Sequence, residues 1–441
     1  GDCLRKEGSM RLGRWVIACA CILAFTPFLF MAPQTKAAEL TDEEVTEFRA
    51  LLEERKVAEE ALSDGEVAAL RGFLDQFKDI TFGGFVENFY QWESVDPISG
   101  DGVAITPKVF DRQENSFTVN NIEMWLYKEA PNPGDVGFKI TLNWGDTARR
   151  ITFVGPVHDE SSTKDQETFS EGFVLWNIPI GKGLTMKFGK FATWVGWEVW
   201  EAHWNANFSR SYIYGWGIPF TNTGVGFSYP VTDRFTADYY FVNTSDTFVN
   251  NNETFTHGVQ LDYNPPDIAS FLKDMNLHLD ILYGVEAGGA AAGDQSANRQ
   301  EEEWRQRYDF TVSFSPFDKW GYVANANWSG SAENGDRQKT SETFGIAQYV
   351  TYQHTDRLGF ALRGEYFWDH DGWAGATGHA NGASAMEITG TVNLLLREKL
   401  WIRPEIRYDA IVSARGDDDA WDDNTSHDEN ITFAIATTYE W

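Results

Sequence analysis

The chain has 441 residues, of which 42% are hydrophobic and 15% are aromatic, and its formal net charge at pH 7 is -30. Such acidity excludes nucleic acid as a partner, because proteins neutralise phosphates with Lys and Arg. A mean hydropathy of -0.40 is too low for a bundle of membrane-spanning helices.

One apolar stretch, residues 15–31, has the hydrophobicity of a spanning helix. It follows two arginines, is interrupted by a proline, and is closed by Ala37 and Ala38. This order is typical of a secretory signal peptide, and the stretch is short for the roughly 20 residues that a membrane span needs. We therefore expect residues 1–38 to be a signal peptide cleaved after Ala37 or Ala38, with the first nine residues lying upstream of a natural start at Met10.

All three cysteines, Cys3, Cys19 and Cys21, precede that cleavage site. The mature chain then has no thiol, which excludes disulfides, Cys-ligated zinc, haem attached through Cys-x-x-Cys-His and cysteine nucleophiles. Lipidation at Cys19 is the less favoured alternative, because no apolar region precedes that residue. Without residues 1–37 the chain keeps 31 basic and 64 acidic residues, a net charge of -33.

The first segment of the mature chain, residues 39–79, is rich in Glu and Ala, and its apolar residues recur at helical spacing. It contains two capping boxes, Thr41 with Glu44 and Ser63 with Glu66. We predict a periplasmic segment of two short amphipathic helices. Two roles remain open for it: a solvated spacer with a weak coiled-coil seam, or a plug or oligomerisation element.

From Ile80 onward the hydrophobic period changes to two and stays so to the end of the chain. In residues 138–144, for example, Phe, Ile, Leu and Trp alternate with polar residues. Alternation of this kind gives each strand one apolar and one polar face. We predict about sixteen strands, beginning near residues 80, 117, 137, 171, 184, 222, 235, 255, 276, 304, 320, 342, 358, 385, 400 and 430.

The connections between these strands alternate in length. Those after even-numbered strands are short and carry turn residues, as in the Pro-Asn-Pro-Gly-Asp run at residues 131–135. Those after odd-numbered strands are long, Gly-rich or acidic, as in residues 94–116 and 194–221. One exception, residues 264–276, is long on the short side, and we expect a helical turn near residues 268–272. An even number of strands with short turns on one side and long loops on the other is typical of an outer-membrane barrel.

The last strand alternates to an aromatic end at Tyr439 and Trp441, which resembles the terminal signal read by the barrel-assembly machinery. The dense aromatic residues fit girdles at two lipid interfaces. The predicted fold is all-β: a transmembrane antiparallel up-and-down β-barrel over residues 80–441, preceded by the short helical segment. We expect it in the bacterial outer membrane, with outer-membrane lipid and lipopolysaccharide around it.

Four runs in the central region carry a family likeness: Gly-Leu-Thr-Met-Lys-Phe-Gly-Lys-Phe-Ala-Thr at residues 183–193, Gly-Trp-Glu at 196–198, Asn-Phe-Ser-Arg-Ser at 207–211 and Pro-Phe-Thr-Asn-Thr-Gly at 219–224. With these runs the chain resembles the OmpL-like β-barrel porins. The likeness covers roughly residues 80–441, with specific motifs only from about 183 to 243. It implies a porin-like barrel, and the segment at residues 39–79 is not part of the pattern.

We name residues 194–221 loop three. It combines five tryptophans with charged residues: Trp194, Trp197, Trp200, Trp204 and Trp216 with Glu198, Glu201, His203 and Arg210. A loop folded into a wide barrel narrows the channel, and opposed charges there set a transverse field. Stacked aromatic faces would suit sugars or other amphipathic solutes. We predict a pore constriction at the charged residues; the alternative is an aromatic girdle with satisfied ion pairs.

Two strands carry charges that alternate with apolar neighbours and should face the lumen, where water solvates them. They are Arg305, Arg307 and Asp309, and Arg403, Glu405, Arg407 and Asp409. Two interpretations stay open, a basic ladder that selects anions and a mixed-charge lumen held together by ion pairs. The overall acidity favours cations.

A distal loop is rich in carboxylates: Asp417, Asp418, Asp419, Asp422 and Asp423, followed by Asp428 and Glu429. Several carboxylates together are what calcium prefers, but the spacing is not that of an EF-hand loop. A solvated acidic loop without metal is the favoured interpretation.

Enzyme motifs are missing from the sequence, which has no HExxH, GxSxG, P-loop or GxGxxG. The eight histidines are scattered, so we expect neither an enzyme nor a cofactor. The predicted function is a porin whose water-filled channel lets small hydrophilic solutes or ions diffuse passively, as a single chain or a homo-oligomer. The alternative is a barrel that sheathes a partner such as a multihaem electron carrier.

Overall fold

The computed structural model describes residues 77, 79–95, 108–151, 167–243, 245–250, 254–267, 269, 271–287, 302–333, 340–370, 382–414 and 429–441. The predicted signal peptide, most of the helical segment at residues 39–79, and the acidic loop from Asp417 to Asp428 lie outside these ranges. No helix in the described ranges is long and apolar enough to cross a membrane.

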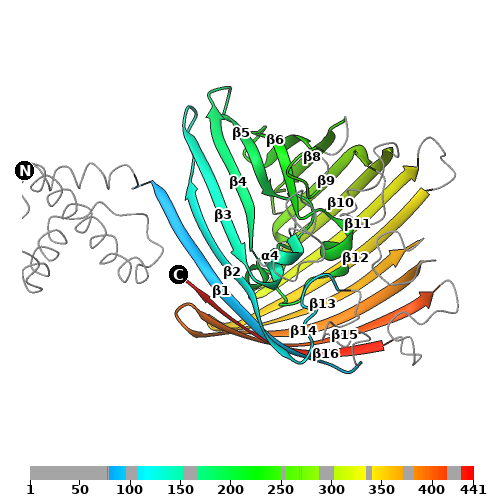
Figure 1. The fold of residues 1–441 in the computed structure, drawn as a ribbon. Coiled ribbons are helices and arrows are strands. Elements are labelled where there is room, and N and C mark those ends of the chain that lie inside the picture. The colour runs from blue at the N-terminus through cyan, green and yellow to red at the C-terminus, as the bar shows by residue number, and fades with distance from the viewer. Residues whose placement is uncertain are drawn as a thin grey trace, which may run out of the picture. The chain divides into compact units, whose positions relative to one another are not determined.

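Sixteen antiparallel strands form a closed barrel in which each strand pairs with its neighbours in the chain and β1 pairs with β16 (Figure 1). The strands are β1 (Ile80–Glu93), β2 (Ser116–Lys128), β3 (Val136–Trp144), β4 (Glu167–Ile178), β5 (Leu184–Ala192), β6 (Thr221–Pro230), β7 (Phe235–Val242), β8 (Thr256–Tyr263), β9 (Lys273–Ala287), β10 (Glu302–Phe317), β11 (Trp320–Glu333), β12 (Thr340–Thr355), β13 (Leu358–Asp369), β14 (Ala383–Arg397), β15 (Leu400–Ala414) and β16 (Glu429–Glu440). The predicted all-β barrel is confirmed, and every predicted strand start lies within four residues of the observed one.

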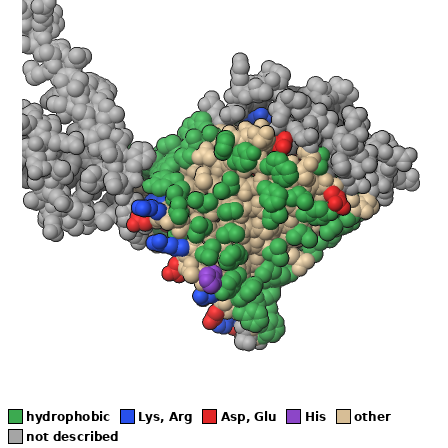
Figure 2. Space-filling model, turned by 90° about the horizontal axis from the view of Figure 1, so that it is seen from below, with side chains coloured by type: hydrophobic (Ala, Val, Ile, Leu, Met, Phe, Trp, Pro, Cys, Tyr) green, Lys and Arg blue, Asp and Glu red, His purple; other side chains and the backbone are tan. Residues whose placement is uncertain are grey.

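The strands turn their apolar side chains outward. On β13, Phe360 and Leu362 are exposed, whereas Ala361 between them and Arg363 and Glu365 beyond them are buried on the other face. The face seen in Figure 2 is covered largely by hydrophobic side chains, and the charged side chains gather near its margins. The barrel therefore presents lipid-compatible surface outward and keeps its charged residues inside.

Short turns join the strands at one end of the barrel. Between β4 and β5 the chain reverses over five residues, with positive φ at Gly181 (59°) and Gly183 (105°). A side chain at Gly183 would place its Cβ 2.5 Å from Oδ1 of Asn177. The backbone conformation therefore favours glycine here, and a larger residue would also have to displace the Asn177 side chain.

Two local features differ from the sequence-based expectation or extend it. A short helix, α4 (Asp146–Ile151), follows β3, where no helix was predicted. The link between β8 and β9 runs over residues 264–272, and its described part is a turn in which Leu272 N donates to Ala269 O at 3.0 Å. Residues 268 and 270, within the predicted helical turn, lie outside the described ranges.

Replacing Gly189 by Ala should destabilise the barrel. Gly189 in β5 has φ of 139°, and an added Cβ would lie 2.2 Å from Gly172 O and 2.7 Å from the Cα of Phe173 on β4. Backbone strain of this kind costs about 1–3 kcal/mol, and the overlap adds to it. The free energy of unfolding, from urea titration of the folded protein in detergent, should fall accordingly. Gly364→Ala is the matched control, because only Glu387 O at 4.0 Å approaches its Cβ; equal losses in the two variants would contradict this account.

Candidate pore constriction

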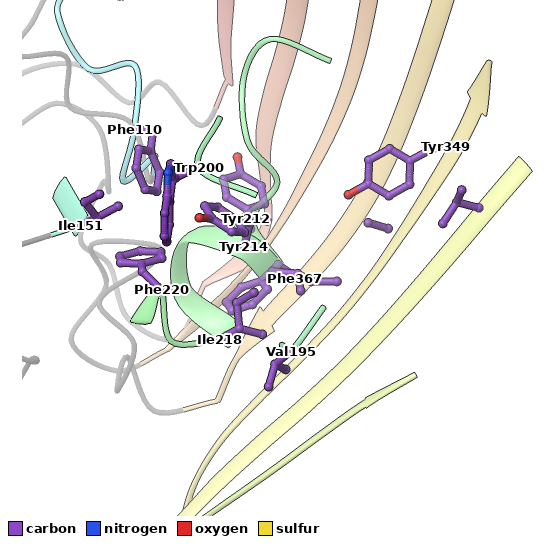
Figure 3. Packing of buried hydrophobic residues seen from close by; sticks show 14 of the residues in the cluster. Phe110, Ile151, Val195, Trp200, Tyr212, Tyr214, Ile218, Phe220, Tyr349 and Phe367 are labelled. Carbon is purple, nitrogen blue, oxygen red and sulfur yellow. The ribbon is translucent and has the colours of Figure 1, made fainter. Parts of the chain in front are cut away.

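Loop three occupies residues 193–220 between β5 and β6 in the structure, 28 residues that include a short 3-10 turn, η1 (Ala202–Trp204), and one π-helical turn, η2 (Ile213–Gly217). It folds into the barrel and packs against inward-facing side chains of the wall. Figure 3 shows this packing, with Tyr212 and Tyr214 of the loop near Phe367 of β13.

An aromatic cluster lies inside the barrel where the loop meets the wall. The ring centroids of Phe110 and Phe220 are 5.2 Å apart, and those of Tyr214 and Phe220 are 5.5 Å apart. Trp200 and Tyr212 are almost fully buried in the same cluster. The loop therefore brings its own hydrophobic core into the lumen, which fixes it to the wall by apolar burial as well as by polar contacts.

Wall carboxylates hold the main chain of loop three by its N–H groups. Glu405 of β15 accepts from Phe208 N at 2.7 Å and Ser209 N at 3.0 Å. Glu365 of β13 accepts from Tyr212 N at 2.6 Å and Ile213 N at 2.7 Å. Each carboxylate thus accepts hydrogen bonds from two buried backbone N–H groups, which in a helix or a sheet would bond to backbone carbonyls.

Wall arginines hold the carbonyl groups of the same loop. Arg363 donates to Ser209 O at 2.5 Å, and Arg407 donates to Arg210 O at 2.7 Å. Arg403 donates to Asn205 O at 2.8 Å. We call Arg363, Glu365, Arg403, Glu405 and Arg407 the wall grid. Together its members bind acceptors and donors along residues 205–213, so the loop path is set by main-chain recognition.

Two of the predicted constriction residues form buried ion pairs. Glu198 Oε1 lies 2.8 Å from Arg363 Nη1, and its other oxygen accepts from Ser211 N at 2.7 Å. Arg210 Nη1 lies 3.2 Å from Asp111 Oδ1, and its guanidinium sits 5.0 Å from the ring centroid of Phe110. Burial raises the pKa of Asp111 to about 6, although Arg210 lowers it. Both charged residues are therefore bound to partners within the lumen.

Burial shifts the pKa values of the other two predicted constriction residues toward their neutral forms. Burial, with Glu123 nearby, raises the pKa of Glu201 well above its usual range. The imidazole of His203 stacks near Phe85, with centroids 4.1 Å apart, and its ring nitrogens have no hydrogen-bond partner among the described residues. Burial, together with Arg403, lowers the pKa of His203 to about 3. His203 is thus neutral at physiological pH.

The five tryptophans of loop three have different environments. Trp194 stacks on Tyr240 at 3.7 Å, and the indole Nε1 of Trp200 donates to Glu123 Oε2 at 3.0 Å. Trp216 is partly buried against the aromatic cluster. By contrast, Trp197 and Trp204 are 38% and 52% exposed.

The predicted lumen residues of β10 and β15 occupy inward positions, and their outward neighbours Trp304, Tyr308 and Ile406 are exposed. On β15, Arg407 Nε donates to Asp409 at 2.8 Å, beside the grid contacts of Arg403, Glu405 and Arg407 described above. On β10, Asp309 accepts from Asn325 and Asn327 at 2.6 and 3.1 Å. Arg307 donates to Ser245 Oγ at 2.8 Å, while Arg305 is half-buried. The structure thus brings the β15 charges to loop three and directs Arg307 to the link between β7 and β8.

Sequence reasoning missed several residues that fix the loop: Arg363, Glu365, Glu387 and Asp111. Arg363 Nε lies 2.6 Å from Glu387 Oε1 on β14. The same alternation that identified Arg403 and Arg407 was available here, because Arg363 and Glu365 alternate with Leu362 and Tyr366 in β13. Asp111 lies before β2, outside any alternation, so no pattern in the sequence marked it.

A family model described as "Putative beta-barrel porin-2, OmpL-like" matches residues 79–440. The chain belongs to this porin family. The porin lies in the bacterial outer membrane and forms a channel. No curated protein sequence is significantly similar to it.

Solved porin structures share the fold at low sequence identity. OmpT of Vibrio cholerae, folded in vitro and in a trimer form, has a TM-score of 0.53 at 11% identity, covering 82% of the porin and 99% of OmpT. The anion-selective porin from Comamonas acidovorans has a TM-score of 0.52 at 9% identity, with the same coverage of both chains. The channel DcaP of Acinetobacter baumannii has a TM-score of 0.53 at 10% identity, covering 82% of the porin and 97% of DcaP. These likenesses show the barrel architecture.

Replacing Asp246 by Asn should weaken the pH dependence of the porin's free energy of unfolding between about pH 4 and pH 6. Asp246 Oδ1 accepts from Phe220 N and Thr221 N, both at 2.8 Å, at the end of loop three. Burial raises the pKa of this carboxyl from 3.8 to about 6, against the opposing effect of those amides. The folded state therefore binds the proton more tightly than the unfolded chain, so this group's contribution to stability declines as pH rises from about 4 to about 6, by roughly 3 kcal/mol in total.

Urea titrations at pH values between about 4 and 7 measure this effect. Asp246→Asn keeps an acceptor for the two amides and tolerates the φ of 58° at this position, so the free energy of unfolding should depend less on pH over that interval. Asp233→Asn is the control, since Asp233 is in an exposed turn. An unchanged pH slope in Asp246→Asn would contradict the assignment.

Proposed function

We propose that the porin is a passive diffusion channel for small hydrophilic solutes or ions, and that loop three narrows it with Glu198, Glu201, His203 and Arg210 at the constriction. The observation that carries this proposal is the attachment of loop three to the inner wall by the wall grid. A loop held this way occupies the lumen beside β13 and β15. Because it is bound to the wall, it sets the cross-section of the channel that remains open.

The remaining path runs, in this proposal, along the wall opposite the grid. Three inward polar side chains there keep contact with solvent: those of Lys139, Asp262 and His278 are 24%, 25% and 28% exposed. They lie on β3, β8 and β9, away from β13 and β15 in the strand order. Charges in a lumen remain where water reaches them, and these positions support an aqueous route on that side.

We infer that the chain acts as a channel and not as an enzyme, because the sequence lacks catalytic motifs and the lumenal charges pair with one another to hold a loop. Outer-membrane lipid and lipopolysaccharide are its expected surroundings, and Trp441 with Tyr439 is the expected signal for the barrel-assembly machinery. A homo-oligomer is supported by OmpT, whose solved structure includes a trimer form.

Replacing Arg363 by Met should enlarge the channel. The variant leaves Glu198 and Glu387 buried without their common partner, and breaking a buried pair in this way costs about 3–5 kcal/mol. We expect loop three to detach and the single-channel conductance in planar bilayers to rise severalfold. Lys182→Met is the control, because the Lys182–Asp233 pair is exposed on a turn; heat-modifiable mobility on gels checks that both variants fold.

An unchanged conductance in a folded Arg363→Met barrel would contradict the constriction. A folded wild-type barrel that carries no current at all would contradict the diffusion function, and would favour the sheath that surrounds a partner.

Replacing Glu198 and Glu201 together by Lys should shift permeability from cations toward anions, because it adds two positive side chains to the loop inside the lumen. The reversal potential in a salt gradient measures this shift. Glu198→Lys also removes the partner of Arg363, so single-channel conductance and heat-modifiable mobility are measured beside the reversal potential. The same change at Asp418 and Asp419 is the control, and we expect it to act mainly at low salt, where screening is weak. Equal shifts at high salt would favour an aromatic collar over a constriction.

A further inference from the structure

A cavity of about 540 Å³ lies between loop three and the ends of β10, β11 and β12 that meet short turns. Loop three contributes Trp197, Val199 and Trp204 to its lining. The wall contributes Ser313, Val323, Tyr349 and Thr351 among others. A volume of this size is within the range of pockets that hold small ligands.

The loop side of the cavity leaves large apolar side chains in contact with solvent. Trp197, Val199 and Trp204 are 38%, 36% and 52% exposed, whereas Trp200 and Tyr212 of the same loop are almost completely buried. Since the loop is inside the barrel, these exposed surfaces face the lumen and not the lipid. Apolar surface kept in contact with water is unfavourable, and concentrated patches of it mark binding sites.

The loop segment that carries these side chains is held in place before any ligand arrives. Asn205 Nδ2 donates to Val199 O at 2.7 Å, and Val199 N donates to Asn205 Oδ1 at 3.0 Å. Arg403 of the wall grid binds Asn205 O at 2.8 Å and Ala206 O at 3.0 Å. A preformed wall reduces the entropy that a ligand loses by ordering its site.

The strand side of the cavity is irregular where its polar residues lie. The β9–β10 register shifts between Ser313 and Ser315, and the β10–β11 register shifts between Phe314 and Phe317. Asp274, which also lines the cavity, has φ of 53°, an unfavourable conformation for a residue other than glycine. Bulges of this kind redirect side chains and occur beside functional sites. Here they place one carboxylate and two hydroxyls beside the tryptophans.

We propose that this cavity binds a neutral, hydroxylated ring compound of about disaccharide size, a solute that the channel function proposed above would bring into the lumen. The indole faces of Trp197 and Trp204 match the C–H face of a sugar ring, and Ser313, Ser315, Thr351 and Asp274 can hydrogen-bond its hydroxyls. Neither Lys nor Arg is among the described residues that line the cavity. An anionic solute would therefore find no counter-charge there.

Calorimetric titration of the full chain with maltose tests the site, in a zwitterionic detergent that has no sugar headgroup. We expect saturable binding of maltose and none of sorbitol, which has hydroxyls but no ring. Maltobionate, in which one ring is opened to a carboxylate, should bind at least tenfold more weakly. Trp197→Leu and Trp204→Leu should each raise the Kd for maltose at least tenfold, and Trp304→Leu, on the outer face, should leave it unchanged.

The absence of saturable maltose binding by the wild type would overturn the site, as would wild-type affinity in Trp197→Leu and Trp204→Leu or an equal loss in Trp304→Leu. Equilibrium binding in detergent does not depend on ion flow. A barrel that conducts but does not bind maltose would therefore defeat this inference alone, and a barrel that binds maltose but carries no current would defeat the diffusion function and leave the site intact.

Discussion

Loop three of this porin places 28 residues of mostly irregular backbone inside a barrel, and that backbone must find hydrogen-bond partners without a sheet or a long helix to supply them. The wall grid supplies these hydrogen-bond partners. Glu365 and Glu405 accept from pairs of amides, while Arg363, Arg403 and Arg407 donate to carbonyls. Because buried polar groups left unpaired are costly, the position of the loop depends on these five wall side chains.

The grid also changes what the charges of loop three can do. A carboxylate or guanidinium that lines an open pore acts on passing ions, but Glu198 and Arg210 are already paired with Arg363 and Asp111. Their first effect is to hold the loop, and their effect on ions comes through the field that remains after pairing. The sequence left two interpretations open, a basic ladder and a mixed-charge lumen held by ion pairs. The ion pair of Arg407 with Asp409 fits the second, whereas Arg403 donates to carbonyl groups of the loop.

The barrel was predictable from the sequence because its rules are local. A period of two gives the strands, and turn residues give their ends, so even β15, with Arg403 and Glu405 facing inward, could be assigned. The constriction was predictable only as a long, aromatic, charged loop. Its partners were not, because alternation tells which face a residue such as Arg363 occupies and not which distant atom it meets. Asp111 and helix α4 lie in connections whose sequence has no hydrophobic period, so no local pattern predicts them.

The grid recognises main-chain atoms, and this has an evolutionary consequence. The N–H groups of Phe208, Ser209, Tyr212 and Ile213 are present in any residue except proline, so the carboxylates that bind them do not select a residue type. The side chains of Phe208, Tyr212 and Ile213 are constrained separately by their burial. Substitutions at the exposed residues Trp197 or Trp204 could then change which solutes pass, while the contacts between the loop and the wall grid are kept. The exposed side chains of the loop can therefore change while the wall residues that anchor it stay the same, and one barrel can give rise to channels that pass different solutes.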